Sequence, residues 1–508
     1  MSRLGPSVDG SLSTLAVVAA GVLVLSFVSL NGSGASTGYV AGVGPAGDGT
    51  VANGPLTPGA KGGNIPGAGG KGTTTVPGSI QANGKPAPLP AGIECRSGAN
   101  GGKTDRGVTA TEIKLGATVV NSGIGTSFLG PVRVGVQAVA NQVNRQGGIC
   151  GRRLKLNLID DGWDGVRDNQ FIHNLVQGDQ VFALAVNPSS EGLRNASREG
   201  YFTKTSTPVI GTDGMLNSQY VDPWIWPVAS STVSTMHIIA KDAYERLHAR
   251  HFSIVFDTQY HFGVEGAFAF NAAVKRLTGS DIDGYFNPGS GGGCSKRFCA
   301  ISAGRPSYAT ENKTFNNACF EGDPKNKCDF LALLLEPNEA LAFMREGFTD
   351  QFVAGMGLAQ TLFSSSFATT CGSMCNGATA WTGYTPPIDQ YASKPAVAEY
   401  VNAVRAVDPT IDVYNQFLEG GYSGMKLTVE ALKRTGPLLT RQNVKTVLDN
   451  LDYDNGLSTP LKWRAGNHYA NVAMQPFIIQ YQGSFNGFRS PGIGWVRDPW
   501  VGLDAPKD

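Results

Sequence analysis

The residue types that carry out chemistry are present in this chain, but they are not arranged as in known catalytic motifs. The six histidines are spread from His173 to His468, and the zinc motif H-E-x-x-H is absent. No serine or cysteine stands between a strand pattern and a helix pattern, where a hydrolase nucleophile stands. The matches "GASTG" and "GVGPAG" lie in a low-complexity stretch, so we attribute them to chance. We expect no catalytic residue and no cofactor.

One acidic cluster offers oxygen atoms of the kind that divalent cations prefer. It comprises Asp160, Asp161, Asp164 and Asp168, which follow one another closely after an apolar stretch. Metal binding by these residues is the less favoured alternative, and we predict no metal site.

The eight cysteines predict disulfide bonds. Their number is even, and the apolar N-terminal segment, for which we predict export, would bring the chain to a compartment where disulfides persist. Close spacing suggests three pairs, Cys294–Cys299, Cys319–Cys328 and Cys371–Cys375, and leaves Cys95 with Cys150. The alternative is free buried thiols. Metal binding by the cysteines is disfavoured because the chain has no C-x-x-C motif and few histidines.

Length and charge narrow the class of protein. The 508 residues suggest roughly two to four folding units, and 41% hydrophobic residues suffice for a soluble core. The net charge is +1, which gives no reason to expect nucleic acid as a partner.

The N-terminal part predicts export from the cytoplasm. Residues Gly10–Leu30 contain no charge and are almost wholly apolar, and about 20 helical residues cross a bilayer. We predict a membrane anchor or signal segment over residues 1–30, with an uncleaved anchor slightly favoured over a cleaved signal. Residues 31–107 hold 22 Gly and 8 Pro in 77 positions, so we predict a disordered linker that tethers an extracytoplasmic domain.

From Thr111 onward, strand patterns alternate with helix patterns. The first set has strands at Ile113–Val120, Arg153–Asp160, Val181–Val186 and Pro208–Gly211, and the pattern restarts with strands at Phe252–Thr258, Asp329–Leu335 and Gln351–Gly357. Such alternation predicts an α/β protein with parallel sheets. Two sets predict two doubly wound lobes, and ligands of such sheets bind at the carboxyl ends of the strands.

The segment after the first helix carries the most specific motif. The sequence "NRQGGICGRRLKLNLIDD" places Asn144, Gly147, Gly148, Ile149 and Gly151 before a strand that ends in two aspartates. With "PVIGTDG", "SIVFDTQYHFG" and "DFLALLLEPNEALAFMREGF", this resembles the type I periplasmic binding proteins, and most of all the leucine/isoleucine/valine-binding proteins of ABC importers. The resemblance covers roughly residues 111–486, and Asp160 and Asp161 match strand-end residues of that family.

The resemblance implies two lobes joined by a hinge of three crossing segments. We expect lobe 1 at residues 108–229 and 381–455, lobe 2 at residues 230–380 and 456–490, and a tail at residues 491–508. An insertion at about residues 289–327 carries four of the cysteines, and its role cannot be read from the sequence.

The resemblance also implies ligand-binding residues on both lobes. In lobe 1 these are Ser189 and Ser190 before a helix, where a helix N-terminus favours an anionic group, and Asp213 and Gly214 in the next loop. Plain helix capping by serine and plain turn chemistry are the alternatives.

In lobe 2, the resemblance points to Tyr260 and Phe262 as aromatic covers of the ligand, with core packing as the alternative, and to Glu336. Amino-acid binders of this family carry a carboxylate after the strand that corresponds to "QFVAGMG", and this chain has Met356 there. A thioether cannot pair with an ammonium group, so amides, urea and aromatic acids remain candidate ligands beside amino acids.

These observations predict a solute-binding protein that captures a small organic molecule and delivers it to an ABC transporter permease. The alternatives are a ligand-sensing receptor for a signalling partner and a secreted hydrolase. Nothing in the sequence separates transport from sensing or identifies the ligand.

Overall fold

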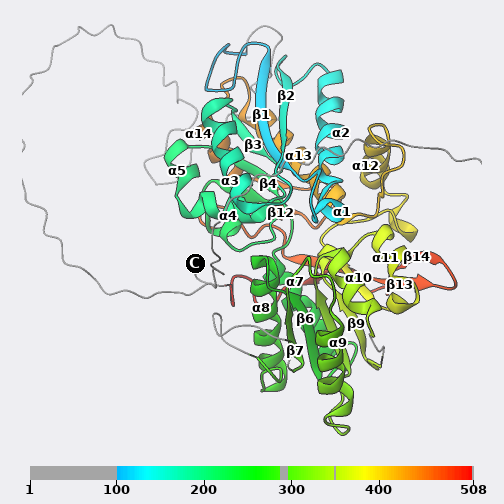
Figure 1. The fold of residues 1–508 in the computed structure, drawn as a ribbon. Coiled ribbons are helices and arrows are strands. Elements are labelled where there is room, and N and C mark those ends of the chain that lie inside the picture. Colours follow the sequence, from blue (N-terminus) through cyan, green and yellow to red (C-terminus); the bar gives the residue numbers. More distant parts are fainter. Residues whose placement is uncertain (1–99, 286–293, 295, 348–350, 506–508) are drawn as a thin grey trace, which may run out of the picture. The chain divides into compact units, whose positions relative to one another are not determined.

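The described residues of the chain form two lobes, each built on a β-sheet with helices on both faces (Figure 1). The computed structural model describes residues 100–285, 294, 296–347 and 351–505. The predicted fold class, α/β with two doubly wound lobes, is confirmed, because parallel strands joined by helices give this arrangement. The predicted N-terminal anchor and most of the predicted linker lie outside the described residues. Among the described helices, none is long and apolar enough to cross a membrane.

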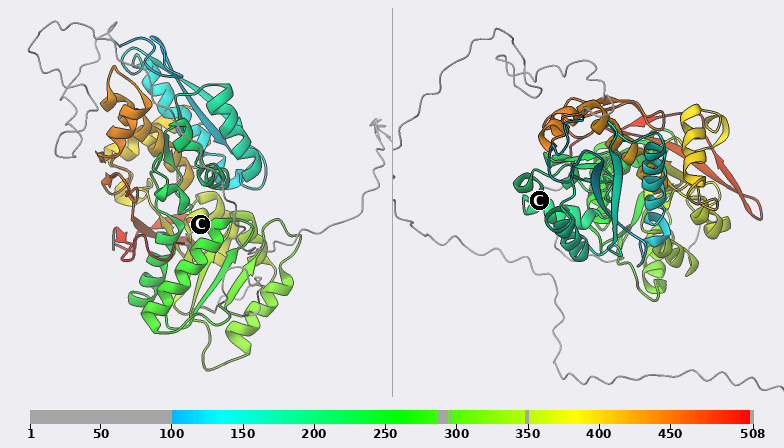
Figure 2. Two further views of the ribbon diagram at one scale, coloured as in Figure 1. Left: turned by 90° about the vertical axis from the view of Figure 1, so that its left-hand side faces the viewer. Right: turned by 90° about the horizontal axis from the view of Figure 1, so that it is seen from above.

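Lobe 1 contains a parallel sheet of strand order β2-β1-β3-β4-β5. Its strands are β1 (Glu112–Val119), β2 (Arg153–Asp160), β3 (Ala183–Ala185), β4 (Val209–Thr212) and β5 (Ile225–Pro227). Its helices are α1 (Thr126–Leu129), α2 (Val132–Arg145), α3 (Gly165–His173), α4 (Ser190–Arg198), α5 (Tyr201–Thr205), α6 (Ser218–Val221), α12 (Pro395–Arg405), α13 (Gln416–Thr435) and α14 (Arg441–Leu448). Figure 2 shows the late helices, in orange, beside the early part of the chain, in blue and cyan.

Lobe 2 contains a sheet of order β14-β13-β10-β9-β8-β6-β7, with β15 paired to β13. Its strands are β6 (Phe252–Asp257), β7 (Phe298–Ile301), β8 (Phe330–Leu334), β9 (Gly355–Leu358), β10 (Thr379–Thr382), β13 (Ala473–Tyr481), β14 (Phe485–Arg489) and β15 (Val496–Arg497). Its helices are α7 (Thr232–Glu245), α8 (His261–Thr278), α9 (Ala309–Asn316), α10 (Pro337–Arg345) and α11 (Ser365–Cys371). Strands β6 to β10 pair in parallel, and β13 is antiparallel to its neighbours.

The two sheets are wound in the same way. In each lobe the second strand lies outside the first, and the third, fourth and fifth follow on the other side. The winding direction therefore reverses at the first strand, between β1 and β3 and between β6 and β8. Side chains beyond the carboxyl ends of the strands at such a reversal are well placed to hold a ligand.

The second sheet is buried on both faces, which explains its continuous apolar strands. In β8, Phe330, Ala332 and Leu334 join one apolar cluster, whereas Leu331 and Leu333 join the cluster on the opposite face. The alternation follows from the two-residue repeat of a strand. It fixes the register of β8 against β6 and β9.

Three segments cross between the lobes, and one side chain connects them. They run from β5 to α7, from β10 to α12, and from β12 (Leu461–Lys462) to β13. The buried Asn471 donates from Nδ2 to the carbonyl oxygens of Val228 (3.3 Å) and Gly383 (3.2 Å) and accepts from Ser230 Oγ at 3.3 Å. Each crossing segment thus contributes to one hydrogen-bonded joint.

Both ends of the described chain are fixed to a lobe. Asn100, in the predicted linker, donates from Nδ2 to the carbonyl oxygens of Ala110 (2.7 Å) and Cys150 (3.0 Å). In the predicted C-terminal tail, β15 pairs with β13, and His237 of α7 contacts Asp498 at 3.1 Å and Asp504 at 3.0 Å. These contacts fix the N-terminal segment to lobe 1 and the C-terminal segment to lobe 2. The residue limits given for the lobes stay a prediction.

The cysteines form the three predicted close pairs. Bonds join Cys294 to Cys299, Cys319 to Cys328, and Cys371 to Cys375. Cys150 is also disulfide-bonded, while its predicted partner Cys95 lies outside the described residues. Two of the bonds flank β7 and α9, so the described part of the predicted insertion supplies an edge strand and a helix of lobe 2.

Glycines let α13 approach α2 closely in lobe 1. A Cβ atom added at Gly135 of α2 would lie 2.5 Å from the backbone nitrogen of Tyr422, and one at Gly421 of α13 would lie 2.6 Å from the carbonyl oxygen of Val132. Backbone atoms cannot move aside as a flexible side chain can. This contact holds α13 against the lobe whose sheet it covers.

The substitution Gly135→Ala tests this packing. Within a helix, alanine is ordinarily more stable than glycine by about 0.5–1 kcal/mol. Here we expect the opposite sign, a loss of about 1–3 kcal/mol, because the new methyl group overlaps backbone. Chemical unfolding measures the difference, with Asn141→Ala on the exposed face of α2 as control. A stabilised Gly135→Ala variant would contradict the close approach.

Candidate functional site

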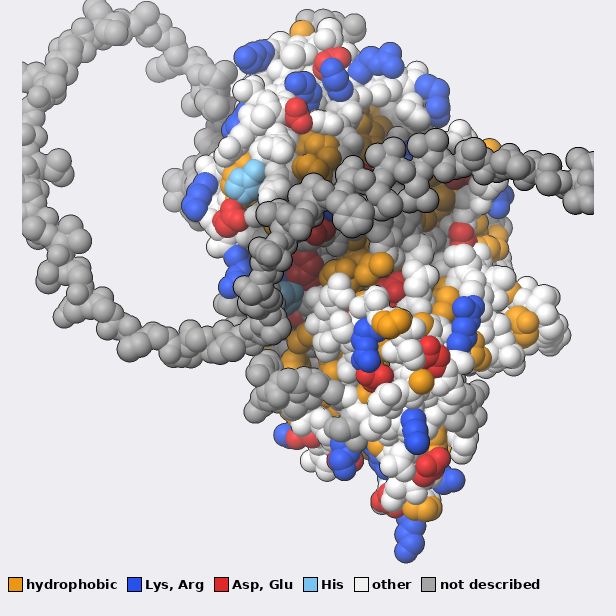
Figure 3. Space-filling view, viewed as in Figure 1, with side chains coloured by type: hydrophobic (Ala, Val, Ile, Leu, Met, Phe, Trp, Pro, Cys, Tyr) orange, Lys and Arg blue, Asp and Glu red, His pale blue; other side chains and the backbone are white. Residues whose placement is uncertain are grey.

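Loops at the carboxyl ends of the strands of both sheets meet between the lobes. We call this region the lobe interface; it comprises residues 121–127, 160–164, 187–191 and 212–217 of lobe 1 and residues 257–263 and 335–339 of lobe 2. Direct contacts connect its two sides, from Glu191 to His261 and from Trp163 to Tyr260. In Figure 3, acidic and apolar side chains gather at the middle of the face, where few Lys or Arg side chains are seen.

Glu191 of lobe 1 caps a helix of lobe 2. Its carboxylate accepts a hydrogen bond from the backbone N–H of His261 at 2.7 Å and contacts His261 Nδ1 at 2.7 Å. His261 is the first residue of α8, and the N-cap residue Tyr260 makes no side-chain capping bond of its own. A carboxylate at a helix N-terminus is favoured by free N–H groups and by the helix dipole. Glu191 therefore stabilises the contact between the two lobes.

An aromatic stack crosses the interface beside this contact. The rings of Trp163 and Tyr260 lie 3.9 Å apart and nearly parallel, and Phe262 lies 6.3 Å from both. Trp163 has a φ of 61°, which bulky residues rarely adopt. Its backbone N–H donates to Asp161 Oδ1 at 2.7 Å, and the absence of a side chain at Gly125 leaves room for its ring. The loop thus presents the indole to the other lobe.

The predicted serines of lobe 1 bind buried carboxylates. Ser189 Oγ donates to Asp161 Oδ2 at 2.6 Å, although Ser189 occupies the N-cap position of α4 and makes no capping bond. Ser190 Oγ lies within 2.9 Å of both oxygens of Asp213, and Gln219 Nε2 donates to Ser190 Oγ and to Asp213 Oδ1, each at 2.9 Å. Helix capping therefore does not explain the hydroxyl of Ser189.

Burial raises the pKa of both carboxyl groups. The pKa of Asp161 rises to about 6 because the group is removed from water, although hydrogen bonds from Ser189 and the Trp163 backbone favour the charged form. The pKa of Asp213 also rises to about 6 through burial, against the hydrogen bonds from Gln219 and Ser190.

Three acidic residues occupy the lobe 2 side of the interface. Glu336 caps α10 by accepting from the backbone N–H groups of Asn338 (2.9 Å) and Glu339 (2.6 Å), and burial raises its pKa to about 7. Burial and the neighbouring Asp257 carboxylate raise the pKa of Glu339 to about 10, and burial raises that of Asp257 to about 6. We infer that this pair holds one proton at neutral pH.

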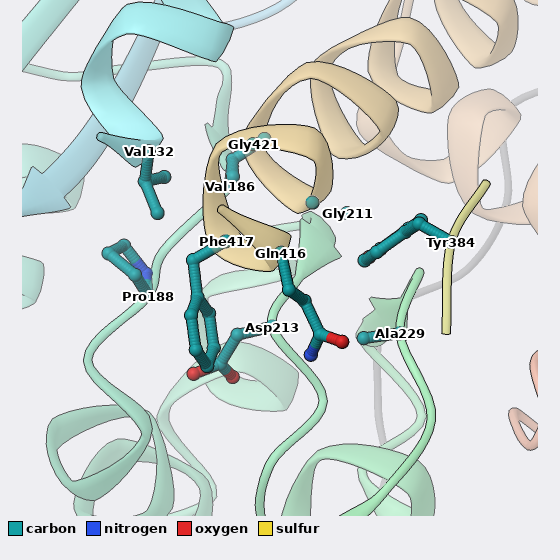
Figure 4. A pocket seen from close by; sticks show the side chains of 11 residues that line it. Val132, Val186, Pro188, Gly211, Asp213, Ala229, Tyr384, Gln416, Phe417 and Gly421 are labelled. Atoms are coloured by element: carbon teal, nitrogen blue, oxygen red, sulfur yellow. The ribbon is translucent and has the colours of Figure 1, made fainter. Parts of the chain in front are cut away.

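A small pocket opens beside the interface, between lobe 1 and the crossing segments. Its lining residues are Val132, Val186, Pro188, Gly211, Asp213, Ala229, Tyr384, Gln416, Phe417, Gly420 and Gly421. Figure 4 shows Phe417 and Asp213 close together on one side, with Gln416 between them and Ala229, and Tyr384 extending from the opposite side. The pocket holds about 290 Å³ of space free of atoms, part of it open to solvent.

The other predicted site residues are placed as follows. Gly214 follows Asp213 with a φ of 66°, and its N–H donates to Gln219 Oε1 at 3.2 Å. Met356 lies within β9, paired with Leu331 and buried in the lobe 2 core. Because β9 ends at Leu358, Met356 lies inside the strand, and Gln360 is the first polar residue beyond its end.

Gln360, two residues beyond β9, is one of several residues in the lobe interface or near it that the sequence does not point to. Its Oε1 accepts from Thr235 Oγ1 at 2.9 Å, and its Nε2 has no partner in the described part of the chain. The others are Trp163, Glu191, His261, Tyr384 and Gln416. A bulky tryptophan directly after "DDG" is a local signal for Trp163, but contacts between distant segments leave no such signal in one sequence.

No metal centre is evident among these side chains. Within the described ranges, no group of three or more His, Cys, Asp or Glu residues is arranged to hold a metal ion. Asp160 accepts from the backbone of Asn121 and Gly162, and Asp164 caps α3. These aspartates therefore shape the loop after β2.

Comparison with known sequences agrees with this architecture. A profile of the family described as periplasmic binding protein matches residues 112–297 and 324–483, more than half of the chain. The chain belongs to the periplasmic binding protein family. This confirms the resemblance to the type I members, whose two sheets and three crossings it shares. No curated protein matches the sequence.

Solved structures of other periplasmic binding proteins have the same fold at low sequence identity. A possible leucine/isoleucine/valine-binding protein from Rhodopirellula baltica SH 1 has a TM-score of 0.61 and 17% identity, covering 75% of this chain and 96% of that one. A fatty acid ABC transporter substrate-binding protein from Thermomonospora curvata has a TM-score of 0.61 and 17% identity. The match covers 81% of this chain and 97% of that one. The branched-chain amino acid transporter substrate-binding protein LivJ from Streptococcus pneumoniae, in complex with isoleucine, has a TM-score of 0.59 and 15% identity. The match covers 75% of this chain and 99% of that one.

The substitution Glu191→Ala tests the cap across the lobes of this binding protein. Loss of a helix cap costs about 1 kcal/mol, so we expect exchange of the amide protons at the start of α8 to become about five-fold faster. Hydrogen exchange of the peptide that contains His261 measures this.

The matched control for this test is Glu199→Ala. Glu199, just after α4, contacts His173 of the same lobe at 3.0 Å. Its removal should leave exchange in α8 unchanged. Equal effects of both substitutions, or none from Glu191→Ala, would contradict closure through this contact.

The buried acids predict how the stability of this binding protein depends on pH. Their folded-state pKa values lie above the unfolded values of about 4, so the folded state binds more protons and stability falls as pH rises from 5 to 8. Each titrating group contributes up to about 1.4 kcal/mol per pH unit.

The substitution Glu339→Gln tests this dependence. Because Glu339 stays protonated when folded, its removal should flatten the slope of the free energy of unfolding against pH, whereas exposed Glu321→Gln should not. Chemical unfolding between pH 5 and 8 measures this slope. An unchanged slope in Glu339→Gln would contradict the assignment of a bound proton to Glu339 in the folded protein.

Proposed function

We propose that this protein captures a small organic molecule between its two lobes outside the cytoplasm and delivers it to an ABC-type importer. The observation that carries the proposal is the lobe interface, where strand-end loops of two similarly wound sheets meet through Glu191–His261 and Trp163–Tyr260. Closing contacts of this kind suit a protein that encloses a ligand by hinge motion.

Family membership supports the proposal and directs it to small solutes. The relatives named above are described as a possible leucine/isoleucine/valine-binding protein, a fatty acid ABC transporter substrate-binding protein and a branched-chain amino acid transporter substrate-binding protein. For this chain we propose an amino acid, an amide or a related compound, and an ABC permease as protein partner. We propose that the ligand contacts the predicted residues Ser189, Ser190, Asp213, Gly214, Tyr260 and Phe262, with Trp163 completing the aromatic wall.

An extracytoplasmic location agrees with the chemistry of the chain. The three described disulfide pairs suit an oxidising compartment. The apolar stretch at Gly10–Leu30, which lies outside the described residues, would export the chain or anchor it. The matched family is described as periplasmic binding protein, which supports our proposal that the captured molecule leaves unchanged.

Thermal unfolding with a panel of amino acids, amides, aromatic acids and short fatty acids tests this function. A ligand that binds only the folded protein stabilises it by about 2.7 kcal/mol at a hundred times its Kd, so a true ligand should raise the melting temperature clearly. Tyr260→Ala should weaken that effect at least ten-fold in Kd, since it removes one side of the stack.

Tyr244→Ala is the matched control. Tyr244 is a half-buried tyrosine of lobe 2 that contacts Arg250, at the opposite end of β6 from Tyr260. It should leave ligand binding unchanged. A panel in which no compound stabilises the protein, or turnover of an ester or peptide substrate, would contradict the proposed function.

A further inference from the structure

The pocket beside the lobe interface combines an apolar body with three polar groups. Five apolar residues line it: Val132, Val186, Pro188, Ala229 and Phe417. Gly211, Gly420 and Gly421 leave space where side chains would otherwise fill it. The polar side chains are those of Asp213, Tyr384 and Gln416 (Figure 4). The other lining residues are apolar or glycine, so these three side chains decide which polar groups a ligand can bring.

Asp213 has one oxygen atom with capacity for a further donor. Its Oδ1 accepts from Gln219 Nε2 (2.9 Å), from the backbone N–H of Met215 (3.2 Å) and shares the hydroxyl of Ser190. Within the described residues, its Oδ2 has only the shared Ser190 hydroxyl, at 2.9 Å. An ionised carboxylate oxygen accepts about two hydrogen bonds, so Oδ2 can take a donor from a ligand.

Tyr384 carries a hydroxyl group whose partner is missing. The residue is 1% exposed, and its Oη makes no hydrogen bond within the described chain. Buried hydroxyl groups are nearly always hydrogen-bonded, so an unpaired one that lines a pocket points to a partner from outside. Tyr384 lies on a crossing segment, opposite Asp213 of lobe 1. A ligand group that pairs with its hydroxyl would therefore lie between lobe 1 and the crossing segments.

Gln416 adds a hydrogen-bond donor. Its Oε1 accepts from the backbone N–H of Gly383 at 3.2 Å, which directs the NH₂ end of the amide toward the Asp213 side in Figure 4. The pocket therefore offers an acceptor at Asp213, a donor at Gln416 and a hydroxyl at Tyr384 that can do either.

The electrostatic environment favours neutral and cationic groups over anions. No Lys, Arg or His is among the residues that line the pocket. Asp213 is the one carboxyl group among the residues that line the pocket, and burial raises the pKa of the nearby Glu419 well above its usual range, so Glu419 stays neutral there. A carboxylate ligand placed here would lose its hydration and face Asp213 without a compensating cation.

Resting on the proposed function, we propose that this pocket binds the end of the ligand that carries a hydrogen-bond donor on a compact apolar body, and that it rejects a ligand whose only polar group is an anion. The donor, from an ammonium, amide or hydroxyl group, meets Asp213 Oδ2 and Tyr384 Oη, and the apolar body packs against Val132, Val186 and Phe417. This selects amines, amides and amino acids and excludes fatty acids.

The pocket is also linked to closure. Ala229 and Tyr384 belong to two of the three crossing segments, so hinge motion moves two of its walls. Because its walls come from both lobe 1 and the crossing segments, we expect a ligand of several heavy atoms to enter while the lobes are apart.

A matched ligand series tests the proposal. The compounds are 3-methylbutylamine, 3-methylbutanamide, 3-methylbutan-1-ol, 3-methylbutanoate and leucine, of which the first four share one apolar body and differ in the polar group. Calorimetry on the full chain should show at least ten-fold tighter binding of the amine or the amide than of 3-methylbutanoate. Asp213→Asn should remove the preference for the amine over 3-methylbutanoate.

Two tyrosine variants separate binding from folding. Tyr384→Phe removes a hydroxyl without a partner, so it should weaken binding of the amine or amide several-fold and leave the melting temperature of the free protein unchanged or raised. Tyr400→Phe removes a buried hydroxyl that donates to the carbonyl oxygen of Val413 at 3.0 Å, so it should lower the melting temperature and leave binding unchanged.

The outcomes also separate this proposal from the proposed function. Preferential binding of 3-methylbutanoate overturns the pocket assignment, as does binding of none of the five compounds while the broader panel yields a ligand; in both cases the solute-binding function stands. Failure of the entire panel overturns the function itself. Unchanged binding in both Asp213→Asn and Tyr384→Phe overturns the assignment of these residues.

Discussion

The hydrogen-bonded joint at Asn471 is the constraint on which the arrangement of the two lobes depends. A buried amide must satisfy its donors and acceptor, and here the partners belong to the other two crossing segments. Three crossings held at one point allow rotation of one lobe against the other but little sliding. The carboxyl ends of both sheets therefore face each other, and loops from distant parts of the sequence meet in one interface.

The electrostatics of the interface follow from this opposition. Each lobe buries carboxyl groups at its strand ends, and each lobe satisfies most of them with its own hydroxyl and backbone donors, as Ser189 does for Asp161 and as the α10 backbone does for Glu336. The lobes are therefore complete as separate units. The lobes also contact each other directly, through Glu191 at the start of α8 and through the stack of Trp163 on Tyr260.

Much of the fold could be predicted from the sequence because it depends on local periodicity. Apolar strands such as Phe330–Leu334 and the valine stripe of α2 are strong local patterns, and the cysteine pairs within ten residues follow from spacing. Strand β7 was missed since it has four residues and stands in a segment rich in glycine and cysteine. The bounds of β9 also differ from the expected strand: it begins at Gly355, later than the apolar run suggests, and ends at Leu358, so Met356 lies within it. A role of Met356 in binding stays a prediction.

The candidate site was less accessible to sequence reasoning because it is made of long-range pairs. Family resemblance pointed to Ser189, Ser190, Asp213, Tyr260 and Phe262, which lie in interface loops, and their role in binding remains a prediction. The Glu191–His261 contact spans both lobes, and Tyr384 and Gln416 approach Asp213 only through the crossing segments and α13. The order in which the strands and helices are connected brings these residues together. Neither their spacing in the sequence nor its composition predicts that they are neighbours.

The most direct test of the central claim, that two lobes close around a ligand by rotating about this joint, is the distance between them in solution. Spin labels introduced as unnatural amino acids at exposed Arg198 of lobe 1 and Lys313 of lobe 2 would report it by pulsed electron paramagnetic resonance. We predict a broad distribution that includes long distances in the free protein and a single, shorter distance once a stabilising compound is bound. One narrow distance that is the same with and without bound compound would contradict the account.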